Sequence, residues 1–178
     1  MAAEQTSAGG LRVVVIGAGM AGILAGIRLS EAGYTDYVIY EKASRLGGTW
    51  RENTYPGIAC DVPAHLYTYT FEPNPDWSHV FAPGDEIQAY FEGVAKKYGV
   101  LPHVRFDSEV VKSVFEGGRW QLTLADGRSD SADVVIAATG VLHYPNLPEI
   151  EGLGDFKGAC FHSARWDHSV PLEGVAWA

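Results

Sequence analysis

The sequence predicts an α/β domain with a central parallel sheet, a small antiparallel β-meander and an extended C-terminal linker. Three apolar runs rich in β-branched residues, at 11–16, 36–40 and 133–138, indicate strands. Near-continuous apolar runs are typical of parallel strands that are buried on both faces of a sheet. Pro and Gly become frequent after Gly140, which leaves no room for a long helix or strand in residues 141–170.

The first apolar run leads directly into a glycine-rich turn, Gly17-Ala-Gly19-Met-Ala-Gly22, and then into an expected helix at 20–32. A strand, a turn and a helix in this order predict a Rossmann-like dinucleotide site. Gly17 permits the tight turn, Gly19 lets the backbone approach a pyrophosphate, and Gly22 allows close packing of the helix on the strand. The N-terminus of that helix directs its N–H groups and positive dipole end at the phosphates.

Glu41 follows the second strand, 24 positions after Gly17, where an acidic ligand of an adenosine ribose is expected. A carboxylate there accepts hydrogen bonds from a ribose diol. It repels the 2′-phosphate of NADP, because unit charges about 4 Å apart repel by about 4 kcal/mol at an effective dielectric of 20. The residues therefore favour FAD or NAD over NADP. The alternative is a solvated charge at the end of a strand.

The middle of the chain is expected to supply the remaining elements. Apolar residues at helical spacing predict an amphipathic helix over 83–98. A short strand is expected at 104–106, and alternation over 109–125 predicts a hairpin. Asp126-Gly127 marks the next tight turn. Residues 47–67 are rich in Gly, Pro and aromatics and predict an ordered loop around a flat ligand, with neither helix nor strand.

Composition excludes several classes of function. A net charge of −9 argues against a nucleic-acid partner, since phosphate binding needs clustered Lys and Arg. No stretch approaches the ~20 apolar residues of a membrane span. Residues 1–10 are small and polar like a disordered lead, so a cytoplasmic location is expected. Neither the histidines nor Cys60 and Cys160 show a metal-ligand spacing, so no metal is expected. Both cysteines are expected to be small buried hydrophobes.

The linker contains a motif that reads Phe156-x-Gly158-x-x-x-His162-x-x-x-Trp166, with Asp167 directly behind. This motif resembles the signature of Baeyer–Villiger-type (class B) flavin monooxygenases. Enzymes of that family use FAD, NADPH and dioxygen to insert an oxygen atom beside a ketone carbonyl. Packing within a surface linker is the alternative interpretation of the same residues.

Other segments carry the same resemblance. Glu41 and the pair Gly47-Gly48 are similar to the extended fingerprint of FAD-binding flavoproteins, which favours FAD over NAD. Residues 47–67 and the Ala-Thr-Gly element at 138–140 also resemble the corresponding parts of the family. The resemblance implies that FAD is held by residues of these motifs: Gly17, Gly19, Gly22, Glu41, Gly48, Thr49, Trp50, Asp61 and Thr139.

The resemblance also implies roles for individual side chains. In the family, the residue matching Asp61 lies on the active-site side and pairs with an arginine from a later part of the chain, so Asp61 is the expected catalytic residue. A turn or cap carboxylate before Pro63 is the alternative. His162 and Trp166 are implied to couple domain movement to cofactor use rather than to attack the substrate.

The resemblance covers the first part of the family's architecture. The expected organisation is a disordered lead (1–10), an FAD-binding domain (11–140) and a linker (141–178) that stops before an NADPH-binding unit, so NADPH is expected only in the full-length enzyme, with a ketone as its substrate. Three alternatives stay open: a non-enzymatic flavin-binding fragment, one half of a split protein completed by a downstream polypeptide, and an N- or S-oxidising flavin monooxygenase.

Overall fold

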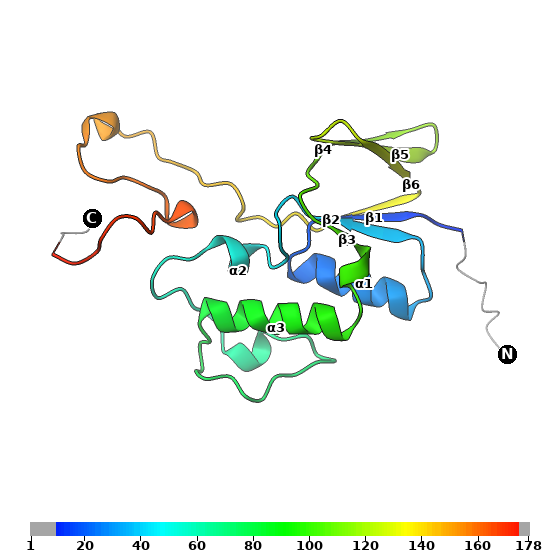
Figure 1. The fold of residues 1–178 in the computed structure, drawn as a ribbon, viewed down its shortest axis with the longest axis horizontal. Coiled ribbons are helices and arrows are strands. Elements are labelled where there is room, and N and C mark those ends of the chain that lie inside the picture. The colour runs from blue at the N-terminus through cyan, green and yellow to red at the C-terminus, as the bar shows by residue number, and fades with distance from the viewer. Residues whose placement is uncertain (1–9, 175–178) are drawn as a thin grey trace.

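The computed structural model describes residues 10–174, which contain two sheets and three α-helices (Figure 1). The parallel sheet has the order β3-β2-β1-β7 and comprises β1 (Val13–Ile16), β2 (Tyr37–Tyr40), β3 (Val104–Arg105) and β7 (Val134–Ala137). The antiparallel meander has the order β4-β5-β6 and comprises β4 (Val110–Glu116), β5 (Arg119–Leu124) and β6 (Ser129–Ala132). The helices are α1 (Met20–Glu31), α2 (Thr49–Glu52) and α3 (Gly84–Lys97), with single 3-10 turns at Ala64–Leu66, Leu101–His103, Leu153–Asp155 and Ser163–Arg165.

The central strand β1 is buried on both faces, which explains its unbroken run of valines. Val13 and Val15 belong to a core shared with α1 and α3, whereas Val14 packs with Leu122 and Ala132 of the meander. Figure 1 shows the two long helices on one side of the parallel sheet and the meander on the other. Successive side chains of a strand point to opposite faces, so an apolar residue is needed at every position.

The expected α/β fold is confirmed, with a parallel sheet and a separate antiparallel sheet. Two expectations are wrong. The segment at 47–67 is not free of helix, because α2 and the turn at Ala64–Leu66 lie within it. Gly48 has φ 55° at the start of α2, and this sharp reversal lets the carbonyls of Gly47 and Gly48 accept the first helical hydrogen bonds. Cys160 is exposed, since it lies in the extended arm; Cys60 is buried as expected.

Arg12 joins the meander to the parallel sheet. Its guanidinium donates to both carboxylate oxygens of Asp130 on β6, at 3.1 and 2.6 Å, and to Asp36 at 2.6 Å. Tyr40 of β2 donates to the same Asp130 carboxylate at 2.8 Å. Burial alone would raise the pKa of Asp130, but the hydrogen bonds from Arg12 and Tyr40 outweigh it and leave that pKa below its ordinary value.

Residues 141–174 extend from the carboxyl end of β7 as an arm without long helices or strands (Figure 1). The expectation of a linker here is consistent with this conformation. The arm returns to the domain near α2, where His168 bonds to Thr54 at 2.7 Å. The expected disordered lead lies, except for Gly10, outside the described residues.

Replacing Asp130 by Asn should lower the free energy of unfolding at pH 7 by about 1–2 kcal/mol. Buried hydrogen bonds to charged groups are worth about 1.5–3 kcal/mol, and partial exposure of Asp130 reduces this. Because folding lowers the pKa of Asp130, its contribution is present above the unfolded value of about 3.9 and is lost as the pH falls through the folded value. Urea titrations at several pH values measure the effect.

The matched control is Asp126→Asn, since Asp126 pairs with Arg128 in an exposed turn. This variant should leave the stability nearly unchanged. Equal losses for the two variants would contradict a joining role for the Arg12 and Asp130 pair.

Candidate functional site

A cavity of about 550 Å³ lies at the carboxyl end of the parallel sheet. It is bordered by the β1–α1 turn, the end of β2, the segment 47–52 and the segment after β7. Ligands of open α/β sheets bind outside the carboxyl ends of the strands, where loops from neighbouring strands diverge. The position of the cavity is therefore that of a nucleotide site.

The glycines of the first turn meet two different steric demands. Gly17 has φ 101°, and a Cβ there would lie 2.6 Å from the carbonyl oxygen of Ala138. A Cβ on Gly22 would lie 1.9 Å from the carbonyl oxygen of Gly17, so the helix packs directly on the turn. A Cβ on Gly19 would meet only Gly48, at 3.6 Å. The fold thus requires Gly17 and Gly22, whereas Gly19 keeps open a space that borders the cavity.

Gln88 of α3 packs against the turn formed by Gly47 and Gly48. Its side-chain amide is buried and donates to the carbonyl of Leu46 at 2.9 Å. A Cβ on Gly47 would lie 1.8 Å from the Gln88 amide oxygen, which explains the glycine at that position. The contact holds Gly48 opposite Gly19, and both residues border the cavity.

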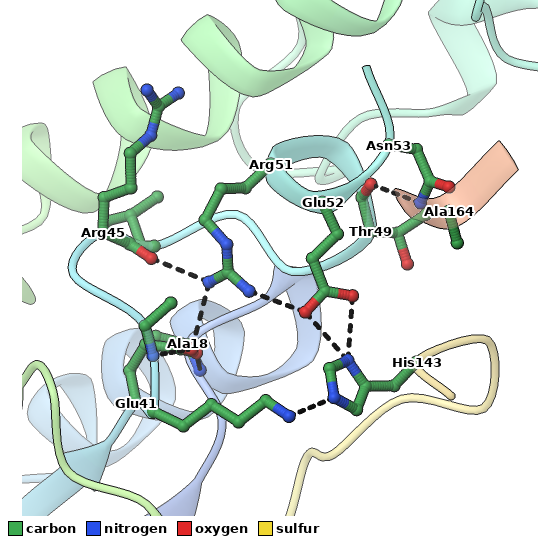
Figure 2. Close-up of polar contacts among 12 residues, drawn as sticks. Ala18, Glu41, Arg45, Thr49, Arg51, Glu52, Asn53, His143 and Ala164 are labelled. Carbon is green, nitrogen blue, oxygen red and sulfur yellow. Dashed lines mark hydrogen bonds and ion pairs between the residues drawn. The ribbon is translucent and has the colours of Figure 1, made fainter. Parts of the chain in front are cut away.

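Glu41 lies where the sequence predicts it, at the end of β2, and it lines the cavity while only 4% exposed. Its carboxylate accepts hydrogen bonds from the main-chain N–H of Ala18 at 2.8 Å and of Ala43 at 2.9 Å. The Arg51 guanidinium lies 3.0 Å away from the same carboxylate (Figure 2). Ribose recognition by Glu41 stays a prediction.

Arg51 alters the electrostatic argument about the 2′-phosphate. Arg51 also pairs with Glu52 at 2.8 Å and donates to the carbonyl of Arg45. The Arg51 guanidinium, whose side chain is 12% exposed, partly offsets the charge of Glu41 while it also pairs with Glu52. The expected preference against NADP therefore rests on Glu41 and Arg51 together, and it stays a prediction.

The remaining predicted cofactor residues divide into two groups. Thr49, Trp50 and Thr139 line the cavity. The Trp50 indole donates to the Tyr67 hydroxyl at 3.1 Å, and the two rings pack edge to face, which fixes the indole. Asp61 is exposed and does not line the cavity, and no cation within residues 10–174 forms an ion pair with it. Its predicted partner is an arginine from a later segment, so its role stays a prediction.

The predicted linker residues belong to the arm and do not line the cavity at the carboxyl end of the sheet, although Trp166 lines a second cavity beside Lys42, Arg51, Glu52 and His143. The His162 ring caps the turn at Ser163–Arg165 by accepting from the N–H of Ala164 at 3.0 Å. Trp166 packs edge to face on Phe161, and Asp167 accepts from the hydroxyl and N–H of Ser169, which lowers its pKa. A Cβ on Gly158 would lie 2.6 Å from the Phe156 ring. These contacts stabilise the local shape of the arm.

Among the cavity-lining residues that sequence reasoning did not identify, Lys42, Arg51, Glu52 and His143 form one chain of polar contacts. They come from three separate segments, and nothing in their spacing shows that they meet. The neighbours of the recognised motifs, Glu41-Lys42 and Trp50-Arg51-Glu52, were the available signal.

Within residues 10–174, no group of three or more His, Cys, Asp or Glu side chains is arranged to hold a metal ion. No helix in this part of the chain has the length and apolar character to cross a membrane.

The family model of an NAD(P)-binding Rossmann-like domain matches residues 15–83. An uncharacterized monooxygenase of Mycobacterium tuberculosis is 54% identical over 162 residues, which cover 91% of this chain and 33% of the relative. A Baeyer–Villiger monooxygenase of Streptomyces coelicolor is 50% identical over 166 residues, which cover 92% of this chain and 32% of that relative. The chain thus spans about a third of the length of these relatives.

Two solved structures of monooxygenases are also similar to this chain over about a third of their length. Cyclohexanone monooxygenase from Rhodococcus, bound to NADP+, superposes with a TM-score of 0.82 at 32% identity, over 91% of this chain and 32% of that one. A steroid monooxygenase bound to NADP superposes with a TM-score of 0.78 at 38% identity, over 89% of this chain and 32% of the steroid monooxygenase.

Replacing Gly19 by Val should preserve the fold but lower dinucleotide affinity by at least about 100-fold, because a side chain there fills the space that the pyrophosphate needs. Calorimetric titration with FAD measures the affinity, and circular dichroism measures the fold. Gly93→Val is the matched control, since Gly93 is an exposed glycine of α3 with open space around it. Unchanged affinity in Gly19→Val would place the pyrophosphate elsewhere.

Proposed function

We propose that this chain, which is related over nine tenths of its length to the N-terminal part of Baeyer–Villiger-type flavin monooxygenases, provides the FAD-binding part of such an enzyme. The complete enzyme would use NADPH and dioxygen to convert ketones to esters or lactones. The proposal includes a cytoplasmic location and, for a split protein, a complementing downstream polypeptide.

One observation carries the proposal. The two glycine turns meet at Gly19 and Gly48, where a Cβ on Gly48 would lie 3.2 Å from the Cα of Gly19; both residues border the cavity, and Glu41 lies at the end of the adjacent strand. This arrangement suits a pyrophosphate that lies in the cavity against the two side-chain-free backbone segments, with a ribose near the carboxylate. The residues therefore fit a flavin dinucleotide.

Each part of the cavity would contribute to binding. The N-terminal N–H groups of α1 would bind the pyrophosphate, and Glu41 would accept from the ribose hydroxyls. Trp50, fixed by Tyr67, would provide an aromatic wall. When bound, FAD would supply the redox chemistry of the reaction, while the protein supplies binding and orientation.

The balance between Glu41 and Arg51 should determine the choice of nucleotide. In Glu41→Gln, Arg51 loses one of its two carboxylate partners and the cavity loses a negative charge, so 2′-phospho-ADP should gain at least about tenfold in affinity relative to ADP. In Arg51→Gln the uncompensated Glu41 should shift the same ratio at least about tenfold the other way. Calorimetric titration of both ligands measures the ratio. Shifts in the same direction for both variants would contradict this balance.

The purified 178-residue chain should bind FAD but should not oxidise ketones with NADPH. Residues 10–174 contain one strand–turn–helix phosphate site, and the proposal assigns it to FAD. The measurement is NADPH consumption together with ester formation, on a panel of cyclic and aromatic ketones. Coupled turnover above the free-flavin background would contradict the proposed division of labour. Turnover that appears only with a separately expressed downstream half would support a split enzyme.

A further inference from the structure

The linker crosses the edge of the nucleotide cavity immediately after β7. Residues Val141, Leu142, His143 and Tyr144 line the cavity together with Thr139 and Gly140. We call residues 141–144 the strap. Any ligand in the cavity would lie against it.

Side chains make most of the contacts that hold the strap. Within residues 10–174, no N–H group of the strap donates to another main-chain group, the His143 carbonyl accepts from the Arg165 guanidinium at 3.5 Å, and the Lys42 ammonium group lies 5.2 Å from the centre of the Tyr144 ring. Val141, Leu142 and Tyr144 are 96%, 71% and 79% exposed, whereas only 16% of the His143 side chain is exposed. His143 is therefore the anchor of the strap.

His143 lies between two oppositely charged partners (Figure 2). Its Nδ1 lies 2.8 Å from the Glu52 carboxylate on α2, and its Nε2 contacts the Lys42 ammonium group. An ammonium group can only donate, so Nε2 accepts and Nδ1 carries the proton that is donated to Glu52. Both ring nitrogens of a neutral imidazole are thus used.

The anchor is continuous with the nucleotide site. Glu52, which accepts from His143, also pairs with Arg51 at 2.8 Å, and Arg51 pairs with Glu41 at 3.0 Å. All four side chains line the cavity. The ion pairs thus run from the predicted ribose ligand to the strap.

We propose that His143 and Glu52 are positioning residues that hold the strap over the nucleotide cavity and slow the release of a bound dinucleotide. The inference rests on the proposed function for its ligand. It assigns to His143 a role that none of the recognised motifs implies.

The rate of FAD release tests the strap directly. The FAD complex is mixed with excess apoprotein of an unrelated flavoprotein as a trap, and the fluorescence of the released flavin is followed. His143→Ala should release FAD about tenfold faster, the factor expected for loss of one hydrogen bond to a charged group. His143→Gln should restore part of the slow release, since a side-chain amide can both accept and donate. Because His143 and Glu52 act through one contact, the double variant of His143→Ala and Glu52→Ala should be no faster than the faster single variant, and additive acceleration would contradict the contact.

His168→Ala is the matched control. His168 also belongs to the arm and bonds to Thr54 close to α2, but neither it nor Thr54 lines the nucleotide cavity. Its release rate should equal that of the unmodified chain. Equal acceleration by His143→Ala and His168→Ala would show that the whole arm, rather than the strap, retains the ligand and would overturn the proposal.

A second measurement is independent of the ligand. Nitrogen-15 spectra of the histidine rings, assigned with His143→Ala, should show His143 as the Nδ1–H tautomer near neutral pH, and the double change Lys42→Ala with Glu52→Ala, which removes both partners of the ring, should abolish this preference. An Nε2–H tautomer, or a ring unaffected by that double change, would overturn the strap. If no variant retains FAD, the proposed function fails and the spectra alone decide about the strap. If FAD binds and His143→Ala leaves its release unchanged, only the strap fails.

Discussion

The contact between Gly22 and the carbonyl of Gly17 is the constraint on which the site depends. A Cβ at Gly22 would lie 1.9 Å from that oxygen, so only glycine lets α1 start so close to β1. This closeness directs the first turn of α1 at the cavity. A Cβ on Gly17 would lie 2.6 Å from the carbonyl oxygen of Ala138, so β1, α1 and the exit from β7 pack closely around these two glycines.

The fold was largely predictable because its signals are local. The unbroken apolar runs of β1 and β2 indicate burial on both faces, and the meander and the helices on opposite sides of the sheet provide that burial. The helix α2 was missed because its single turn depends on the positive φ of Gly48 and on hydrogen bonds to the Gly47-Gly48 carbonyls, which composition does not reveal. Cys160 was expected to be buried because its residue type usually is, but the arm around it has little core to enter.

The glycines and Glu41 of the site were predictable because their roles depend on position along one chain segment. The partners of Glu41 were not predictable, because Arg51 comes into contact with Glu41 only when the chain folds. The consequence is chemical: the charge of the Glu41 carboxylate, which the sequence predicts to repel a 2′-phosphate, is partly offset by the Arg51 guanidinium, which Glu52 shares. His143 shows the same limit, since its two partners, Lys42 and Glu52, lie about a hundred residues earlier in the chain.

The account depends most on FAD occupying the cavity beside the two glycine turns. Hydrogen–deuterium exchange followed by mass spectrometry, with and without FAD, tests this most directly. The account predicts slower exchange in peptides that cover the start of α1, the segment 47–52 and the strap, with little change in the meander strands β5 and β6. Protection confined to other segments, or no protection at FAD concentrations that saturate binding, would contradict it.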